Sequence, residues 1–370
     1  MTLTGLVSIA RQIIYFQKNR LARTLLMAPT PEWYSIAVTF RCNSRCATCG
    51  IWNSPAEDEV SLDVYSRFFE DKLVSKARNI EFTGGEPTLR KDIVEIISEA
   101  YEKCPKARVS LGTNCILDER VIEIAETFKT RPLHFSMSID GFGTLHDNIR
   151  GVPNNFTKVL SVIHGLQELK SNGHPISFGA SVCVSSLNVE KLSPLLQFLE
   201  KQRIPFQLTP YLKTRYGQFE RSRISHAQLD FDNAKLKLAA RRLFAKYDRP
   251  TYGRFVKFWA GEEYQKPPCY VLTKGSVSVR PNGDIPVCMF HDRKFILGNI
   301  ASEDFANIWN GNHTQELRRT LHDCKECSYT HPNLCDALNN YYFHGWGYRD
   351  SILLGQRSKL LRFVVKRTLR

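Results

Sequence analysis

The sequence predicts an α/β protein built around a parallel β-sheet, followed by a small cysteine-rich unit. Two observations predict the sheet: short apolar segments recur between residues 34 and 209, and segments with helical periodicity separate them. Connections of this length suit parallel strands, which need a crossover instead of a tight turn. A third observation marks the second unit. From residue 263 onward, cysteines and the turn Pro281-Asn282-Gly283-Asp284 replace the alternation of strands and helices.

Each expected element follows from its local pattern. Strands are predicted at 34–39, 79–83, 108–113, 133–139, 176–184 and 205–209. Helices are predicted at 62–74, 91–103, 118–129, 155–172 and 189–202, with an Arg- and Lys-rich helix at 226–247. The apolar runs of the strands predict a sheet that is buried on both faces. Strands near 275–280 and 285–290 are predicted to form a hairpin across the 281–284 turn.

The length and composition predict more than one structural unit. The chain has 370 residues, of which 42% are hydrophobic, and this is enough for a large core. No apolar run reaches the roughly 20 residues of a membrane span, and we expect no secretory signal. The predicted divisions are a basic amphipathic helix at 1–31, the main domain at 32–215, a helical linker at 216–262, a cysteine-rich domain at 263–340 and a basic tail at 341–370.

The positive charge is concentrated at the two ends of the chain. The net charge is +14, and residues 1–31 and 351–370 contain basic but no acidic side chains. A basic groove across the body of the protein is not expected, so we predict no nucleic-acid binding. We predict a cytoplasmic protein. A peripheral contact of the basic ends with the inner face of the membrane is one alternative, and packing of their apolar faces on the protein is the other.

Three cysteines follow the first predicted strand with the spacing C-x3-C-x2-C. They are Cys42, Cys46 and Cys49. In a cytosolic chain, clustered cysteines indicate metal ligands before disulfides. A cubane iron–sulfur cluster usually takes four cysteines, so three would leave one iron open for another ligand. A zinc knuckle, or three unrelated thiols, is the alternative. Cys104 and Cys183 are interpreted as structural thiols.

Three further motifs accompany this loop. They are Thr83-Gly84-Gly85-Glu86-Pro87 after the second strand, Ser136–Gly141 at the end of the fourth, and His146–Gly151. Together with the run RCNSRCATCG, they resemble the radical S-adenosylmethionine (SAM) superfamily, in the branch with cysteine-rich C-terminal extensions. The resemblance covers about residues 34–340. It implies a partial (β/α)6 TIM-like barrel with a C-terminal SPASM/Twitch-like extension.

The resemblance also implies roles for individual residues. Cys42, Cys46 and Cys49 would bind a catalytic 4Fe–4S cluster, and SAM would bind its open iron. The residues expected around SAM are Gly84, Gly85, Glu86, Pro87, Asn114, Ser138, Asp140 and Arg150. The Gly-Gly-Glu-Pro segment would accept hydrogen bonds from the SAM ammonium. Arg150 would pair with the SAM carboxylate, the alternative being a solvated loop arginine.

Two positions depart from the family pattern. Thr48 stands where many members carry an aromatic residue against the adenine, so Ile51 or Trp52 would have to supply that contact. Cys115 replaces the glycine of a common Thr-Asn-Gly motif, which brings this thiol nearer to the expected site. Neither departure affects the expected cluster ligands.

A second cysteine group resembles the SPASM and Twitch extensions, which hold auxiliary clusters. It comprises Cys269, Cys288, Cys324, Cys327 and Cys335. We expect one auxiliary 4Fe–4S cluster on the first four of these, with Cys335 as the competing fourth ligand. A structural zinc site is the alternative, because the C-x2-C spacing also suits zinc and His322 and His331 lie nearby.

The resemblance implies an enzyme that cleaves SAM reductively to a 5′-deoxyadenosyl radical, which then abstracts hydrogen from a substrate. A small molecule, sugar or lipid-linked intermediate is the preferred substrate, with net oxidation through the auxiliary cluster as an option. Maturation of a ribosomal peptide is the alternative, and a zinc-binding protein without enzymatic activity is the remote one. The resemblance also implies a low-potential electron donor of the flavodoxin or ferredoxin type, since acidic donors are attracted to a basic enzyme.

Overall fold

The computed structural model describes residues 30–54, 58–211, 234–247, 276–287 and 295–321. The chain divides into two compact units. One comprises residues 30–230 and 275–317 and contains the sheet. The described helix of the other unit is α9 (Ala234–Lys246), which lies inside the predicted helix 226–247.

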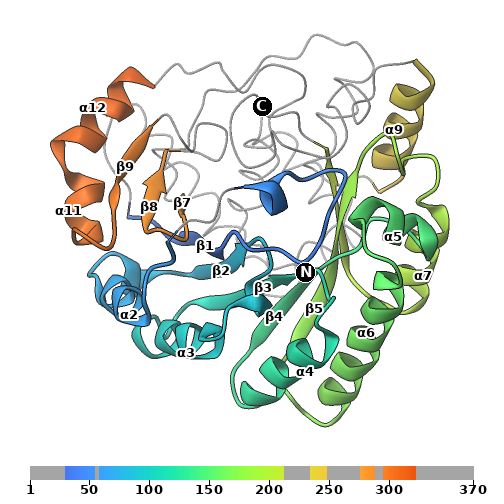
Figure 1. Ribbon diagram of the computed structural model, residues 1–370, viewed down its shortest axis with the longest axis horizontal. Coiled ribbons are helices and arrows are strands. Elements are labelled where there is room, and N and C mark those ends of the chain that lie inside the picture. Colours follow the sequence, from blue (N-terminus) through green and yellow to red (C-terminus); the bar gives the residue numbers. More distant parts are fainter. Residues whose placement is uncertain (1–29, 55–57, 212–233, 248–275, 288–294, 322–370) are drawn as a thin grey trace, which may run out of the picture. The chain divides into compact units, whose positions relative to one another are not determined.

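The core of the larger unit is a parallel sheet with the strand order β6-β5-β4-β3-β2-β1-β7 (Figure 1). All six predicted strands are present. Their bounds are β1 (Trp33–Thr39), β2 (Asn79–Gly84), β3 (Arg108–Thr113), β4 (Leu133–Ser138), β5 (Ser177–Val184) and β6 (Phe206–Pro210). Because they follow one another across the sheet, the segments that leave their C-terminal ends lie along one edge.

The five helices predicted between these strands are confirmed within a few residues. They are α2 (Leu62–Glu70), α3 (Ile93–Lys103), α4 (Asp118–Thr127), α6 (Asn155–Ser171) and α7 (Ser193–Lys201). Sequence periodicity missed the shorter α5 (Thr144–Arg150), α11 (Phe305–Asn310) and α12 (Asn312–Thr320), and the 3-10 turns η1 (Ile51–Asn53), η2 (Val74–Lys76) and η3 (Pro87–Leu89). None of the helices in the described part of the chain is long and apolar enough to cross a bilayer.

The predicted C-terminal hairpin is wrong. Strand β7 (Ser276–Val279) joins the main sheet in parallel beside β1, while β8 (Asp284–Pro286) pairs in antiparallel fashion with β9 (Ile296–Asn299). Val277 and Val279 of β7 pair in register with Tyr34 and Ile36 of β1, and both valines are buried. The sheet therefore offers these valines an apolar face, and β8 pairs with β9 instead.

The prediction of a sheet buried on both faces rested on continuous apolar runs, but the strands alternate between buried and partly exposed residues. On one face, Tyr34 packs edge-on against Phe68 of α2 and Phe305 of α11, with ring centroids 5.8 and 5.7 Å apart. Helices α2, α3, α4 and α6 lie along the outer side of the sheet in Figure 1. The opposite face, called the inner face below, carries mainly serine, threonine and glycine, and most of these residues are only half-buried.

Candidate functional site

The cysteine loop, residues 41–50, leaves the C-terminal end of β1 and is fixed by backbone contacts. The N–H groups of Arg45 and Ala47 donate to the carbonyls of Arg150 and Ile149 at 3.0 and 2.8 Å. These carbonyls belong to the last turn of α5, so they are available for hydrogen bonds from outside the helix. On the other side, Trp52 Nε1 donates to the Cys49 carbonyl at 2.8 Å. The loop therefore has a defined shape within the protein itself.

Two of the three thiols of the loop lie close to polar side chains. Cys46 Sγ lies 3.1 Å from Ser44 Oγ, which also donates to the Arg150 carbonyl at 2.9 Å. Asn114 Nδ2 lies 3.9 Å from Cys42 Sγ. Burial raises the pKa of Cys42 to about 11 and that of Cys49 to about 12. Both thiols therefore keep their protons at neutral pH in the absence of metal, and cluster binding would release them.

The arrangement of these thiols fits a cluster in which each sulfur binds its own iron. Cys46 is close enough to raise the pKa values of Cys42 and Cys49, and Cys42 is close enough to raise that of Cys49. Within the described residues, however, no three His, Cys, Asp or Glu side chains converge as the ligands of a single ion would. A cubane does not require this convergence, because its ligands bind separate corners.

The two glycines of the Gly-Gly-Glu-Pro segment allow the end of β2 to pack directly on the cysteine loop. The N–H of Gly85 donates to the Thr39 carbonyl at 2.8 Å, and that of Glu86 donates to the Arg41 carbonyl at 2.9 Å. A Cβ atom at Gly84 would lie 2.1 Å from Thr39 O, and one at Gly85 would lie 2.2 Å from Arg41 O. Glycine is therefore required here by the protein's own backbone.

The carboxylate of Glu86 links two strands of the sheet. It is buried and accepts hydrogen bonds from the Thr88 hydroxyl (2.7 Å), the Thr113 hydroxyl (2.9 Å) and the Asn114 N–H (2.7 Å). Burial raises its pKa, and these donors oppose the rise. Thr113 ends β3, so Glu86 holds the end of β2 beside it. Pro87 follows as the first residue of η3.

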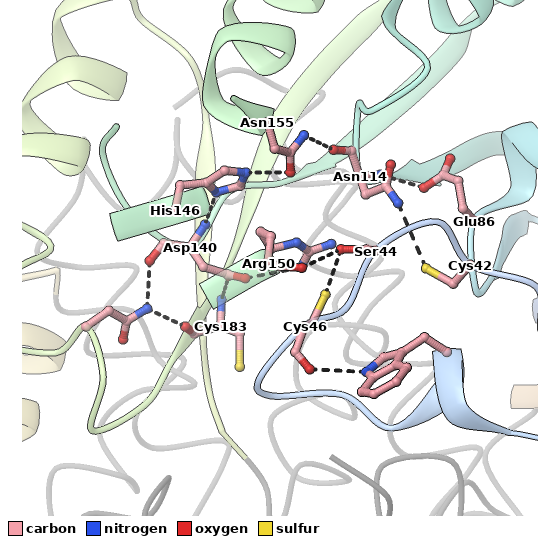
Figure 2. A network of polar contacts seen from close by, with 12 residues as sticks. Cys42, Ser44, Cys46, Glu86, Asn114, Asp140, His146, Arg150, Asn155 and Cys183 are labelled. Carbon is pink, nitrogen blue, oxygen red and sulfur yellow. Dashed lines mark hydrogen bonds and ion pairs between the residues drawn. The ribbon is translucent and has the colours of Figure 1, made fainter. Parts of the chain in front are cut away.

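A buried chain of hydrogen bonds runs from Asn114 to Asp140 (Figure 2). Asn155 Nδ2 donates to the Asn114 carbonyl at 3.1 Å, and Asn155 Oδ1 lies 3.0 Å from His146 Nε2. His146 Nδ1 accepts the Asp140 N–H at 3.1 Å, so Nε2 carries the proton. Burial lowers the pKa of His146 to about 4, and the ring is neutral at physiological pH.

Arg150 is held between the cysteine loop and the end of β4. Its Nη1 donates to Asp140 Oδ2 at 3.1 Å, and Asp140 Oδ1 accepts the Cys183 N–H at 2.8 Å. The Arg150 side chain is only 13% exposed, so the solvated-loop alternative is excluded. Burial lowers its pKa, but Cys46 and Asp140 raise it more, and the guanidinium stays charged. Its buried Nε has no hydrogen-bond partner among the described residues, which leaves a cationic donor for an anionic ligand.

Two cysteines that sequence reasoning treated as secondary also lie at this edge. The thiol of Cys183, at the penultimate position of β5, is near Cys49 and the hydroxyl of Thr48, and burial raises its pKa. The interpretation of Cys183 as a structural thiol in an apolar segment did not anticipate this position beside the cysteine loop. Cys115 is fully buried next to Asn114 and has a φ of 61°, which explains why a glycine would suit this position.

Of the remaining predicted site residues, Ser138 lies within the described part of the chain and the second cysteine group does not. Ser138 is the last residue of β4, where it is half-buried on the inner face in register with Ser181. The second cysteine group lies outside the described residues. Its members are Cys269, Cys288, Cys324, Cys327 and Cys335.

Comparison with known families matches two parts of the chain. The family model described as the radical SAM superfamily matches residues 36–199. The SPASM model, described as an iron–sulfur cluster-binding domain, matches residues 269–328. The first match includes the cysteine loop and the whole of the hydrogen-bonded edge described above, and the second contains four of the five cysteines of the second group.

Two relatives and one solved structure show the range of similar proteins. The Fe-coproporphyrin III synthase of Methanosarcina barkeri is 31% identical over 45% of this chain and 41% of its own length. The subtilosin biosynthesis protein AlbA of Bacillus subtilis is 23% identical over 76% of this chain and 60% of its own. The chain therefore covers less than two thirds of either relative. The structure of anSMEcpe with bound AdoMet has the same fold, with a TM-score of 0.58, 17% identity and coverage of 91% and 98%.

Proposed function

Because the chain belongs to the radical SAM superfamily and carries a SPASM iron–sulfur domain, we propose that it is an enzyme that abstracts hydrogen from a small organic substrate. When bound, a 4Fe–4S cluster and SAM supply the reductive cleavage that generates the abstracting 5′-deoxyadenosyl radical. The chain's own contribution is to hold these groups, to orient the substrate and to exclude competing reactions.

One observation carries this proposal. The loop with Cys42, Cys46 and Cys49 lies at the C-terminal ends of parallel strands, beside a buried guanidinium with an unused donor. Three thiols supply three corners of a cubane, and the edge of the sheet is where parallel α/β proteins place their reactions. The residues present therefore fit the cluster and an anionic ligand next to it.

The polar edge assigns distinct tasks to the residues around SAM. We assign the SAM carboxylate to Arg150, whose Nε is unused, and Asp140 positions that guanidinium. The carbonyls of Gly84–Pro87 would accept the SAM ammonium, since the carboxylate of Glu86 is committed to Thr88, Thr113 and Asn114. Asn114 and Ser138 lie at the ends of β3 and β4 and complete the pocket.

The SPASM domain is assigned one auxiliary 4Fe–4S cluster. Its proposed ligands are Cys269, Cys288, Cys324 and Cys327, with Cys335 as the competing fourth ligand. The match of the SPASM model to residues 269–328 supports the first four. The match at 36–199 supports the main domain at 32–215, and residues 275–317 of the proposed second domain share a compact unit with that sheet.

A small-molecule substrate is preferred, and the name of the Methanosarcina relative, a porphyrin synthase, supports it. Ribosomal peptide maturation is the second candidate. It is supported by AlbA, which is a bacteriocin biosynthesis protein and matches 76% of this chain. Comparing deoxyadenosine formation in the presence of a tetrapyrrole and of a peptide precursor would separate the two.

Enzymes of this superfamily need a reductant and a substrate. We propose an acidic flavodoxin- or ferredoxin-type donor in the cytoplasm, which the net charge of +14 would attract. Contact of the basic ends with an anionic membrane surface rests on sequence alone, since residues 1–29 and 322–370 lie outside the described part. Flotation of the full chain with anionic vesicles at low salt, with and without residues 351–370, would test that contact.

Anaerobic SAM turnover tests the proposed function. Full-length protein reconstituted with iron and sulfide should release 5′-deoxyadenosine and methionine when reduced. Serine at Cys42, Cys46 or Cys49 should lower this release by at least about 100-fold, because the cluster loses a ligand. Cys104→Ser is the matched control. Its thiol is buried against the carbonyls of Phe69 and Val74, away from the cysteine loop. Equal release by the variants of the loop and by the control would contradict the proposal.

A further inference from the structure

A single row of polar side chains crosses the inner face near the beginnings of the strands. Register pairs connect Ser278 to Ser35, Ser35 to Glu81, Glu81 to Ser110, Ser110 to His134 and His134 to Ser177. Each residue comes from a different strand. We call these six residues the serine row. Neither the sequence motifs nor the radical chemistry accounts for them.

The serine row is unusual for a barrel-like sheet. The interiors of parallel barrels are normally filled by layers of bulky branched side chains. Here four of the six positions are serine, and the next layer toward the C-terminal ends contains Ala37, Thr83, Gly112, Ser136 and Gly179. These side chains are too small to fill the interior from the strands alone. Ser35, Glu81, Ser110, His134 and Ser278 are half-buried and Ser177 is exposed, so the row is accessible.

The row contains one acid and no cation. Glu81 accepts a hydrogen bond from Ser35, and burial raises its pKa to about 7. His134 lies 2.9 Å from the Ser177 hydroxyl, and burial lowers its pKa to about 4, so it is neutral. Arg108, the first residue of β3, lies one step nearer the strand beginnings and is exposed. Among the described residues, a ligand of the row therefore meets hydroxyl groups, a neutral imidazole and a carboxyl, with Arg108 as the nearest cation by register.

The row faces the same interior as the candidate site. Glu81 precedes Gly84 by three residues on β2, and this corresponds to about 10 Å along the strand. A substrate whose reacting carbon lies at the C-terminal edge could thus place a group ~10 Å away on the row. A negatively charged group would be disfavoured there by Glu81, whereas an ammonium would find a carboxylate and several hydroxyl acceptors.

We propose that the serine row binds a cationic amino group of the substrate, with Glu81 as its counter-ion and Ser35 and Ser110 as hydrogen-bond partners. This inference rests on the proposed function, because it assumes that the substrate reacts at the C-terminal edge. It adds a second point of attachment at the opposite end of the strands and restricts the substrate class to amines.

Binding of three matched probes tests the row without turnover. The probes are 4-aminobutanol, 1,4-butanediol and 4-hydroxybutyrate, which differ in one terminal group and carry positive, zero and negative charge. Reconstituted full-length protein is titrated at pH 8 and followed by ligand-observed NMR. We expect 4-aminobutanol to bind, the diol to bind about tenfold more weakly, and the anion to bind more weakly still, because a charge-assisted hydrogen bond is lost.

Variants localise the binding. Glu81→Gln preserves shape and should weaken 4-aminobutanol binding about tenfold while leaving diol binding unchanged. Glu168→Gln, an exposed acid on α6, is the matched control and should change neither. SAM cleavage without substrate is measured on the wild-type and Glu168→Gln proteins, so a failure of the radical chemistry would be seen separately. Equal binding of the amine and the diol, no binding of the amine, or no effect of Glu81→Gln would overturn the proposal.

Discussion

Polar side chains at the two ends of the same strands differ in burial and in hydrogen bonding. At the C-terminal edge, Glu86, Asp140 and His146 are nearly inaccessible, and each has several hydrogen-bond partners at 2.7–3.1 Å. At the beginnings of the strands, Glu81 and Ser110 are half-buried on an inner face of small residues. Paired polar groups make a rigid site, whereas half-buried groups with few partners remain free for a ligand.

This difference suggests two kinds of function in one sheet. The C-terminal edge is preorganised, because its hydrogen bonds are made before any cofactor arrives. The serine row places an acid where burial penalises its charge, and this is a cost that folding alone does not explain. A ligand would relieve that cost. Substitutions at one end or the other should therefore have different effects on stability and activity.

The close contact between β2 and the cysteine loop should tolerate no added side chain. In Gly85→Ala, the new Cβ would lie 2.2 Å from the Arg41 carbonyl oxygen. The backbone would have to separate, and we expect a loss of about 3 kcal/mol in the free energy of unfolding together with loss of SAM cleavage. Chemical denaturation and the deoxyadenosine assay measure the two effects.

Gly112→Ala is the matched control on the inner face of β3. Its Cβ would lie 3.7 Å from the Phe82 carbonyl oxygen, which is ordinary van der Waals contact. We expect the free energy of unfolding of Gly112→Ala to change by less than about 1 kcal/mol, in either direction. If both glycine variants lost the same stability, the close approach would not be the reason for the glycine at position 85.

The sequence predicted the C-terminal edge far better than the serine row. Cys42 and Gly85 belong to contiguous motifs, and a short segment of sequence is enough to identify them. The six strands were also predictable, because each contains alternating or continuous apolar residues. The partner of β7 was not, since Val277 and Val279 would fit a hairpin or a sheet edge equally well.

The serine row escaped sequence analysis for a physical reason. Its members are single residues on six strands, separated by long crossovers, and only the register of the sheet aligns them. A serine within an apolar strand carries no signal alone. Cys183 was missed similarly, because its position beside Asp140 depends on the pairing of β4 and β5.

Removing the acid from the serine row should stabilise the protein at high pH. Burial raises the pKa of Glu81 from 4.5 to about 7, so the folded state favours the neutral acid. The stability that this preference provides is complete below pH 4.5 and is lost as the pH rises through 7. The difference in free energy of unfolding between Glu81→Gln and wild type should therefore be about 1 kcal/mol more favourable to the variant at pH 8 than at pH 5. This figure allows for the partial exposure of the side chain.

Unfolding midpoints at pH 5, 6.5 and 8 measure this difference. Glu168→Gln, which replaces an exposed glutamate on α6, is the matched control for the substitution itself. A Glu81→Gln protein that tracks wild type across the range would mean that the carboxyl is not penalised by burial, and the contrast between the two ends of the strands would weaken.

The C-terminal edge should respond to pH with the opposite sign. Burial lowers the pKa of His146 from 6.5 to about 4. Between these pH values the histidine is therefore protonated in the unfolded chain but not in the folded protein. Stability is complete above pH 6.5 and falls as the pH drops toward 4, by about 1 kcal/mol at pH 5.5. His146→Gln should remove this slope and lower stability at pH 7.5 by breaking contacts with Asp140 and Asn155. His134 also has a pKa lowered to about 4, so the comparison is made in a His134→Gln background. The proteins compared are His134→Gln and the His134→Gln, His146→Gln double variant. If their free energies of unfolding fell equally between pH 7.5 and 5.5, His146 would not be the neutral, fully paired group that makes this edge rigid.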